Sequence, residues 1–85
     1  MSELDADKVK LFTGRANPVL AQKICDHLDV PLGRGRTEIF PDGELMVRID
    51  EDVRGRDCFV IQPTCHPINS HLMELFIWID TLRRA

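Results

Sequence analysis

An unbroken apolar run constrains the fold of this chain more than any other feature of its sequence. The run extends from Cys58 to Ile61, within the segment CFVIQPT of residues 58–64. A strand with one face in water usually alternates polar and apolar residues, so a run without alternation predicts a strand that is buried on both faces. Such strands belong to parallel sheets that are covered by helices. The sequence therefore favours an α/β fold.

A helix is predicted upstream of this run, in NPVLAQKICDHLDV, residues 17–30. Asn17 is a good N-cap, and Pro18 suits the first helical position because the missing N–H has no partner there. We expect Pro31 and Gly33 to end the helix. Apolar residues at helical spacing predict the face that packs on the core. These residues are Leu20, Ile24 and Leu28, with Ala21 and Cys25 beside them.

Three further strands are predicted from short alternating segments. KVKLFTG, residues 8–14, precedes the helix, and RTEIF, residues 36–40, follows it. A Pro-Asp-Gly turn then leads into ELMVRID, residues 44–50. Turns of this composition join antiparallel strands, so the second and third strands are expected to form a hairpin.

The segment INSHLMELFIWIDTLRRA, residues 68–85, predicts a long second helix that Asn69 or Ser70 can cap. Trp78 lies off its apolar stripe. The stripe consists of Leu72, Leu75, Phe76, Ile79 and Leu82. The resulting order is strand, helix, hairpin, strand, helix. A further strand is expected after Ala85, so the chain resembles the front of a larger parallel-sheet domain.

Composition restricts the function classes. Eighty-five residues suffice for one small domain, with residues 1–7 as a polar leader. The net charge of −3 argues against a nucleic-acid binder, and no apolar segment is long enough to cross a membrane. The three cysteines form no CxxC pair, so neither a disulfide framework nor a zinc site is expected and a reducing, cytoplasmic setting fits. The three histidines are scattered, which predicts no metal site.

Two segments have the chemistry to bind a ligand, and each has a plainer interpretation. Arg54, in a Val-Arg-Gly turn, can contact an anion because guanidinium matches phosphate oxygens, or it is an ordinary solvated arginine. In FPDGE, a purine ring can stack on Phe40 while Asp42 and Glu44 accept hydrogen bonds from its amine or from ribose hydroxyls. Composition alone favours a hairpin tip with Phe40 tucked under the turn.

The chain resembles the start of a ribose-phosphate pyrophosphokinase, also called phosphoribosyl pyrophosphate synthetase. The resemblance covers residues 10–85, in KLFTGRANPVLAQKI, FPDGELMVRIDEDVRGRDCFVIQPTCHPIN and HLMELFIWIDTLRRA. Four motifs carry it: F-x-D-G-E, E-x-V-R-G-x-D, a strand ending in I-Q-x-T, and N-x-x-L-M-E-L. Their combination is specific, although each alone is weak.

The resemblance implies an enzyme that transfers pyrophosphate from ATP to ribose 5-phosphate with Mg²⁺ and gives phosphoribosyl pyrophosphate for nucleotide biosynthesis. It also implies a phosphoribosyltransferase-like (Rossmann-like) domain with a protruding β-hairpin, in dimers that commonly build hexamers. By this resemblance the hairpin holds the adenine of ATP in a neighbouring subunit's site. That role falls on Phe40, Asp42 and Glu44, with Gly43 giving the tight turn.

Two departures qualify the resemblance. Arg54 corresponds to an arginine of a regulatory phosphate or ADP site, but Asp52 stands where many regulated members have Ser, and a carboxylate repels phosphate. The family's magnesium ligands, basic catalytic loop and ribose 5-phosphate loop lie downstream of Ala85. Residues 8–85 are therefore expected to be part of the N-terminal domain, truncated and inactive alone. Two alternatives are a non-catalytic synthetase-associated subunit and an interaction module that uses the helix face from Leu72 to Leu82.

Overall fold

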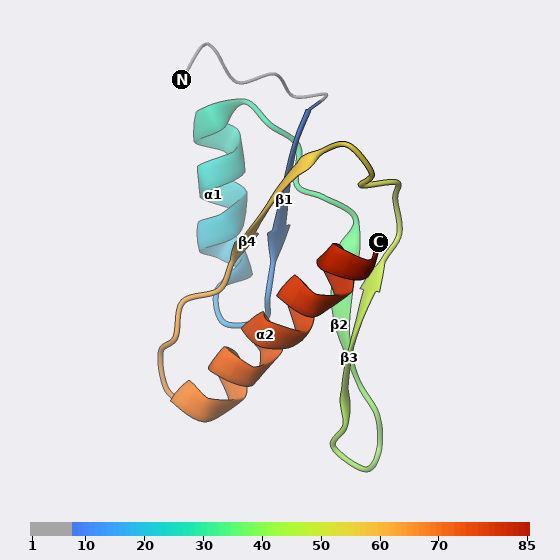
Figure 1. The fold of residues 1–85 in the computed structure, drawn as a ribbon. Helices are drawn as coiled ribbons and strands as arrows, with labels where there is room; N and C mark the ends of the chain where they lie inside the picture. Colours follow the sequence, from blue (N-terminus) through green and yellow to red (C-terminus); the bar gives the residue numbers. More distant parts are fainter. Residues whose placement is uncertain (1–7) are drawn as a thin grey trace.

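The computed structural model describes residues 8–85, and the predicted leader, residues 1–7, lies outside the described residues. The chain forms two small sheets and two helices (Figure 1). In chain order the elements are β1 (Val9–Thr13), α1 (Pro18–Leu28), β2 (Gly35–Ile39), β3 (Leu45–Ile49), β4 (Asp57–Ile61) and α2 (Ile68–Arg84). This order is the predicted one.

A parallel pair of strands, β1 and β4, forms the centre of the fold, with Val9 opposite Asp57 and Thr13 opposite Ile61. The two helices lie on opposite sides of this pair (Figure 1). Leu11 points to the α1 side, where it packs with Cys25, whereas its neighbour Phe12 points to the α2 side. The α/β class, with a parallel sheet between helices and a projecting hairpin, is thereby confirmed.

Strand β4 departs from prediction in its burial. Its residues Cys58 and Val60 face α2 and are partly buried, but Phe59 on the other face is 52% exposed. The prediction of a strand buried on both faces is wrong for the described residues. The reason is that α1 packs over β1 rather than over β4, and β1 is the only strand within residues 8–85 that pairs with β4.

Helix α1 begins as predicted. Asn17 is its N-cap and accepts a 3.0 Å hydrogen bond at Oδ1 from the N–H of Leu20. The helix ends at Leu28, earlier than the expected stop at Pro31 and Gly33, because Asp29 adopts a left-handed conformation with φ of 57°. Asp29 is a residue type that tolerates this conformation and so can cap a helix C-terminus.

The predicted core face of α1 is displaced toward its small residues. Ala21 and Cys25 are fully buried, while Ile24 and Leu28 are half-buried and Leu20 is exposed. Small side chains let the helix lie close to β1, so the longer residues beside them reach only the edge of the contact.

Strands β2 and β3 form the predicted antiparallel hairpin, with Thr37 opposite Val47. One face of its base packs against α2, and the other carries charged residues in water. Those residues are Arg36, Glu38, Arg48 and Asp50, which form ion pairs with one another. The far half of the hairpin extends away from the body of the molecule (Figure 1).

Helix α2 buries a different face from the one predicted. Its N-cap is Pro67, and neither Asn69 nor Ser70 caps it, because both lie inside its first turn. Glu74 and Trp78 are the fully buried residues. The prediction that the apolar stripe is the buried face of α2 is therefore wrong. Leu75 and Leu82 are half-buried, but the three other members of the stripe are exposed. These are Leu72, Phe76 and Ile79.

A carboxylate connects the segment after β3 to the rest of the domain. Glu51 pairs with Lys10 of β1 at 2.9 Å and accepts a hydrogen bond from the backbone N–H of Arg34 at 2.5 Å. Burial alone would raise the pKa of Glu51, but these two partners outweigh it and hold the pKa below its usual value. Within residues 8–85, no helix has the length and apolar character to cross a bilayer.

Candidate functional site

The hairpin tip is held by its own backbone. The N–H of Phe40 donates to the carbonyl of Glu44 at 2.9 Å, and the N–H of Gly43 donates back to the carbonyl of Phe40 at 2.8 Å. Gly43 has a φ of 87°, a region that residues with a Cβ rarely adopt. Asp42 stabilises the turn further, since its Oδ1 accepts from the N–H of Glu44 at 3.0 Å. These contacts fix the order of the tip side chains along the turn.

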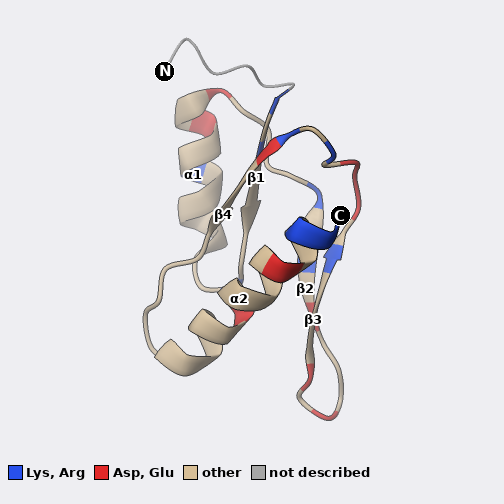
Figure 2. Cartoon of the chain, viewed as in Figure 1, with Lys and Arg blue, Asp and Glu red and all other residues tan. Residues whose placement is uncertain are grey.

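The tip presents an aromatic ring and two carboxylates to solvent. Phe40 is 39% exposed, so it is not tucked under the turn, and Asp42 and Glu44 are both exposed. Acidic residues without any basic residue mark the tip, whereas basic residues lie at the base of the hairpin (Figure 2). Among the described residues, no hydrogen bond or ion pair reaches the side chain of Glu44. The tip therefore offers a stacking surface next to hydrogen-bond acceptors.

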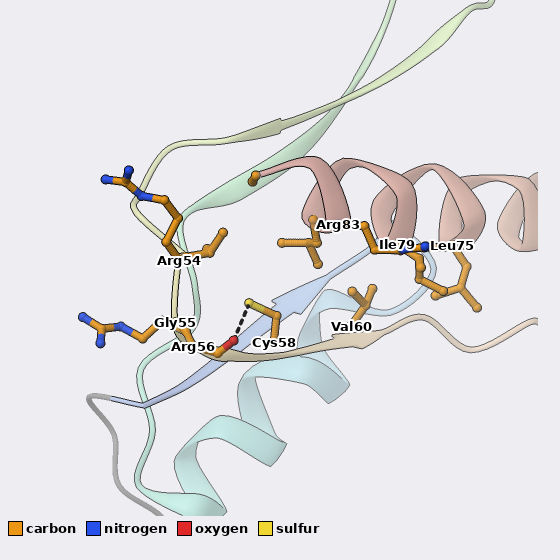
Figure 3. A pocket seen from close by; sticks show the side chains of 11 residues that line it. Arg54, Gly55, Arg56, Cys58, Val60, Leu75, Ile79 and Arg83 are labelled. Atoms are coloured by element: carbon orange, nitrogen blue, oxygen red, sulfur yellow. Dashed lines mark hydrogen bonds between the residues drawn. The ribbon is translucent and has the colours of Figure 1, made fainter.

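The Val-Arg-Gly turn borders a separate cavity of about 450 Å³ beneath α2. Its floor is apolar and includes Val60 and Ile79, while the side chain of Arg54 points away from that floor (Figure 3). Arg54 is bound to its neighbour: Nε lies 3.1 Å from Asp52 Oδ1, and the Arg54 N–H donates to the same oxygen at 3.1 Å. Hydrogen bonds from Arg54 lower the pKa of Asp52 below its usual value. Asp52 thus already pairs with the Arg54 guanidinium that an anion would have to bind.

Sequence reasoning missed a buried polar cluster at the ends of β1 and β4. Glu74 is fully buried and accepts from Gln62 Nε2 at 2.9 Å, from the N–H of Arg15 at 3.1 Å, and from the Thr37 hydroxyl. Trp78 Nε1 donates to that hydroxyl at 2.9 Å. The one signal in the sequence was a carboxylate in the middle of a helix that is apolar on nearly all sides, and a buried carboxylate requires such partners.

Cysteine and histidine side chains contribute no metal centre to the described part of the chain. No three His, Cys, Asp or Glu side chains gather there in a way that could hold an ion. Cys65 lies 3.7 Å from His71 Nδ1, but that nitrogen also contacts the Cys65 carbonyl at 2.8 Å. Burial raises the pKa of Cys25 and of Cys58, which disfavours a reactive thiolate at either position.

Comparison with known proteins assigns the family. Residues 9–85 match the model of the N-terminal domain of ribose phosphate pyrophosphokinase. The ribose-phosphate pyrophosphokinase of Burkholderia pseudomallei is 52% identical over 79 residues, which are 93% of this chain and 25% of that protein. The enzyme of the same name from Maricaulis maris is 56% identical over 77 residues, 91% of this chain and 25% of that protein.

A solved structure agrees with these matches. The phosphoribosylpyrophosphate synthetase of Mycobacterium smegmatis superposes with a TM-score of 0.85 at 45% identity, over 91% of this chain and 26% of that one. Fold and motifs together define an α/β domain of the phosphoribosyl pyrophosphate synthetase type. The chain belongs to the ribose-phosphate pyrophosphokinase family, through the N-terminal domain of that enzyme. It spans about a quarter of the length of the relatives that it matches.

Proposed function

We propose that residues 8–85 are the first part of the N-terminal domain of a ribose-phosphate pyrophosphokinase, which transfers pyrophosphate from ATP to ribose 5-phosphate. Family membership supports the reaction class, and the relatives carry that name. The contribution of this chain is binding rather than chemistry. Transfer of this kind depends on metal and phosphate contacts, and no metal ligand set lies among the described residues.

The hairpin tip is the proposed ATP-binding element. The observation that carries the proposal is the exposed ring of Phe40 beside the carboxylates of Asp42 and Glu44, on a turn whose backbone is fixed by Gly43. Adenine stacks on the ring, and its exocyclic amine or the ribose hydroxyls donate to the carboxylates. A projecting hairpin also suits a site completed by a neighbouring subunit, as expected for a homo-oligomer.

The test replaces the matching quarter of the Burkholderia pseudomallei relative with this chain and measures ATP-dependent product formation. Phe40→Ala should weaken ATP binding by about 1–3 kcal/mol, the usual worth of base–aromatic stacking, or about 5- to 150-fold. Asp42→Ala should also weaken it. Met46→Ala is the matched control, since Met46 is an exposed apolar residue on the same hairpin. ATP affinity that is unchanged in both tip variants would remove the proposed role.

The isolated 85-residue chain is expected to form no product from ATP and ribose 5-phosphate. Turnover by the purified chain would contradict the assignment of catalysis to other parts of the enzyme. The second candidate function is a non-catalytic synthetase-associated subunit. Phe40 disfavours it, because the family resemblance implies that such relatives tend to lose the aromatic residue at this position. We place the enzyme in the cytoplasm, which suits the free cysteines Cys25, Cys58 and Cys65.

Two further assignments remain proposals. Arg54 contributes to a regulatory phosphate site only weakly, because Asp52 already neutralises it. The exposed apolar residues of α2 form a contact between subunits, as expected for a protein that assembles through dimers. These residues are Leu72, Met73, Phe76 and Ile79. Elution of the chain as a stable, monodisperse monomer would count against the contact.

A further inference from the structure

The carboxylate of Glu74 lies where the hairpin meets the body of the domain. One oxygen accepts from Gln62, which follows β4, and the other accepts from the N–H of Arg15, which follows β1, and from the hydroxyl of Thr37 in the middle of β2. Glu74 is fully buried, so water does not compete for these bonds. One α2 side chain therefore joins the hairpin to the carboxyl ends of both parallel strands.

Between Thr37 and its tip, the hairpin packs little against the rest of the domain. Val47, which lies opposite Thr37 in the hairpin, is 5% exposed and belongs to the same buried cluster as Trp78. One residue pair further on, Met46 is 49% exposed, and two pairs further on, Ile39 is 53% exposed. Thr37 thus stands at the point where the hairpin leaves the packed domain.

The Thr37 hydroxyl has a defined orientation. It accepts a 2.9 Å hydrogen bond from the indole Nε1 of Trp78, which leaves its single proton for the carboxylate of Glu74. Both partners belong to α2 and are buried. Valine has a similar shape to threonine, but it can make neither bond.

A small rotation at this point is amplified at the tip. Phe40 lies three residues beyond Thr37, or about 10 Å along an extended strand. A turn of about 10° at Thr37 would move the Phe40 ring by about 2 Å, and displacements of about 1 Å are enough to lose oriented contacts with a substrate. The angle of the hairpin therefore matters to whatever its tip binds.

We propose that Glu74, acting through Thr37, is a positioning residue for the nucleotide: its carboxylate sets the angle at which the hairpin presents Phe40 to ATP. The inference rests on the proposed ATP-binding role of the tip. It adds a residue that touches no nucleotide and that lies on a different element from the tip.

The experiment uses the chimera in which this chain replaces the matching quarter of the Burkholderia pseudomallei relative, isotope-labelled for NMR, with Thr37→Val as the main variant. Residual dipolar couplings report whether β2 and β3 keep one fixed orientation relative to β1 and β4. Titration with ATP, followed at the Gly43 amide, reports binding at the tip. Thr37→Ser is the conservative rescue, because it keeps the hydroxyl. Val30→Ala is the stability control, since Val30 is buried in the core cluster on the α1 side.

The expected result has three parts. In Thr37→Val the hairpin couplings no longer fit the orientation of the central strands, and the Kd for ATP rises about tenfold. Thr37→Ser restores both readouts to within about twofold. Val30→Ala lowers stability but changes neither the couplings nor the Kd. Thr37→Ala removes the same hydroxyl without placing a new methyl group against the carboxylate, and it replaces Thr37→Val if that variant does not fold.

Two failures can be told apart. Hairpin couplings in Thr37→Val that still fit the orientation of the central strands overturn the positioning role, whatever the ATP affinity. A wild-type chimera in which ATP leaves the Gly43 amide unshifted overturns the proposed function of the tip. An equal rise of Kd in Val30→Ala and Thr37→Val would also overturn positioning, because it would show an effect of stability alone.

Discussion

Replacing Glu74 with Gln removes one acceptor from a buried cluster in which both carboxylate oxygens are used. Gln62 Nε2 donates to one oxygen, while Thr37 and the N–H of Arg15 donate to the other. A glutamine keeps one oxygen and gains an amide group that can only donate. Either orientation of the new side chain therefore brings its NH₂ against a donor.

Rotation of Gln62 does not relieve the conflict. Its Oε1 accepts from the N–H of Ala16 at 3.0 Å, and its Nε2 also donates to the carbonyl of His71 at 3.3 Å, so a flip would break both contacts. A buried polar group left without a partner costs about 1–3 kcal/mol, and one donor–donor contact leaves two such groups. We expect Glu74→Gln to lower the free energy of unfolding by about 2–6 kcal/mol.

The assay is urea denaturation followed by the emission of Trp78, the only tryptophan in the chain. The matched rescue is Gln62→Glu in the Glu74→Gln background, which exchanges the acceptor and the donor between the two positions. Gln62→Glu alone places two carboxylates together and should be strongly destabilising. Gln62→Glu also loses the hydrogen bond to the His71 carbonyl in both backgrounds, so the double variant should be more stable than the sum of the two single effects predicts, by about 1 kcal/mol or more. Additive effects of the two changes, or an unchanged midpoint for Glu74→Gln, would refute the donor–acceptor reasoning.

Three further perturbations follow from the contacts of single residues. Because the pKa of Glu51 is lowered in the fold, its pairing with Lys10 stabilises the chain above the unfolded pKa and is lost as pH falls through the folded one. Glu51→Gln should therefore cost about 1–2 kcal/mol at pH 7 and almost nothing in acid, measured by urea titration at several pH values. Cys65 is exposed, so a thiol reagent should label it in the native chain, whereas Cys25 should react only on unfolding; rapid native labelling of Cys25 would contradict its burial. Asp52→Asn should strengthen the binding of inorganic phosphate at Arg54, visible at low salt as larger phosphate-induced NMR shifts of the Arg54 amide. Equal shifts in the variant and the wild type would exclude a phosphate site there.

Much of the fold follows from local patterns in the sequence. The Cys58–Ile61 run predicts the parallel strand, Asn17 predicts the start of α1, and the Pro-Asp-Gly turn predicts the hairpin with its tip at Asp42. Each of these signals depends on residues within a few positions of one another. The early end of α1 at Asp29 was missed because Pro and Gly are stronger stop signals than Asp, although Asp also tolerates the left-handed conformation.

The buried face of α2 depends on contacts that are distant in sequence. Apolar spacing favours Leu72 and Phe76, but Glu74 is buried instead because Arg15, 59 positions away, and Thr37, 37 positions away, supply its hydrogen bonds. No local pattern contains those donors. The position of the candidate tip residues could likewise be predicted, whereas the point at which the hairpin is anchored could not.

The pairing of β1 with β4 also sets an order for folding. The hairpin and both helices lie within short stretches of chain, but β1 meets β4 only after α1 and the hairpin have been looped out between them. Closing a long loop costs entropy before the contacts form, so local elements form faster than such a pair. We expect amide protection to develop first in the two helices and the hairpin and last along β1. A nascent chain would then contain a formed hairpin before β1 has paired with β4.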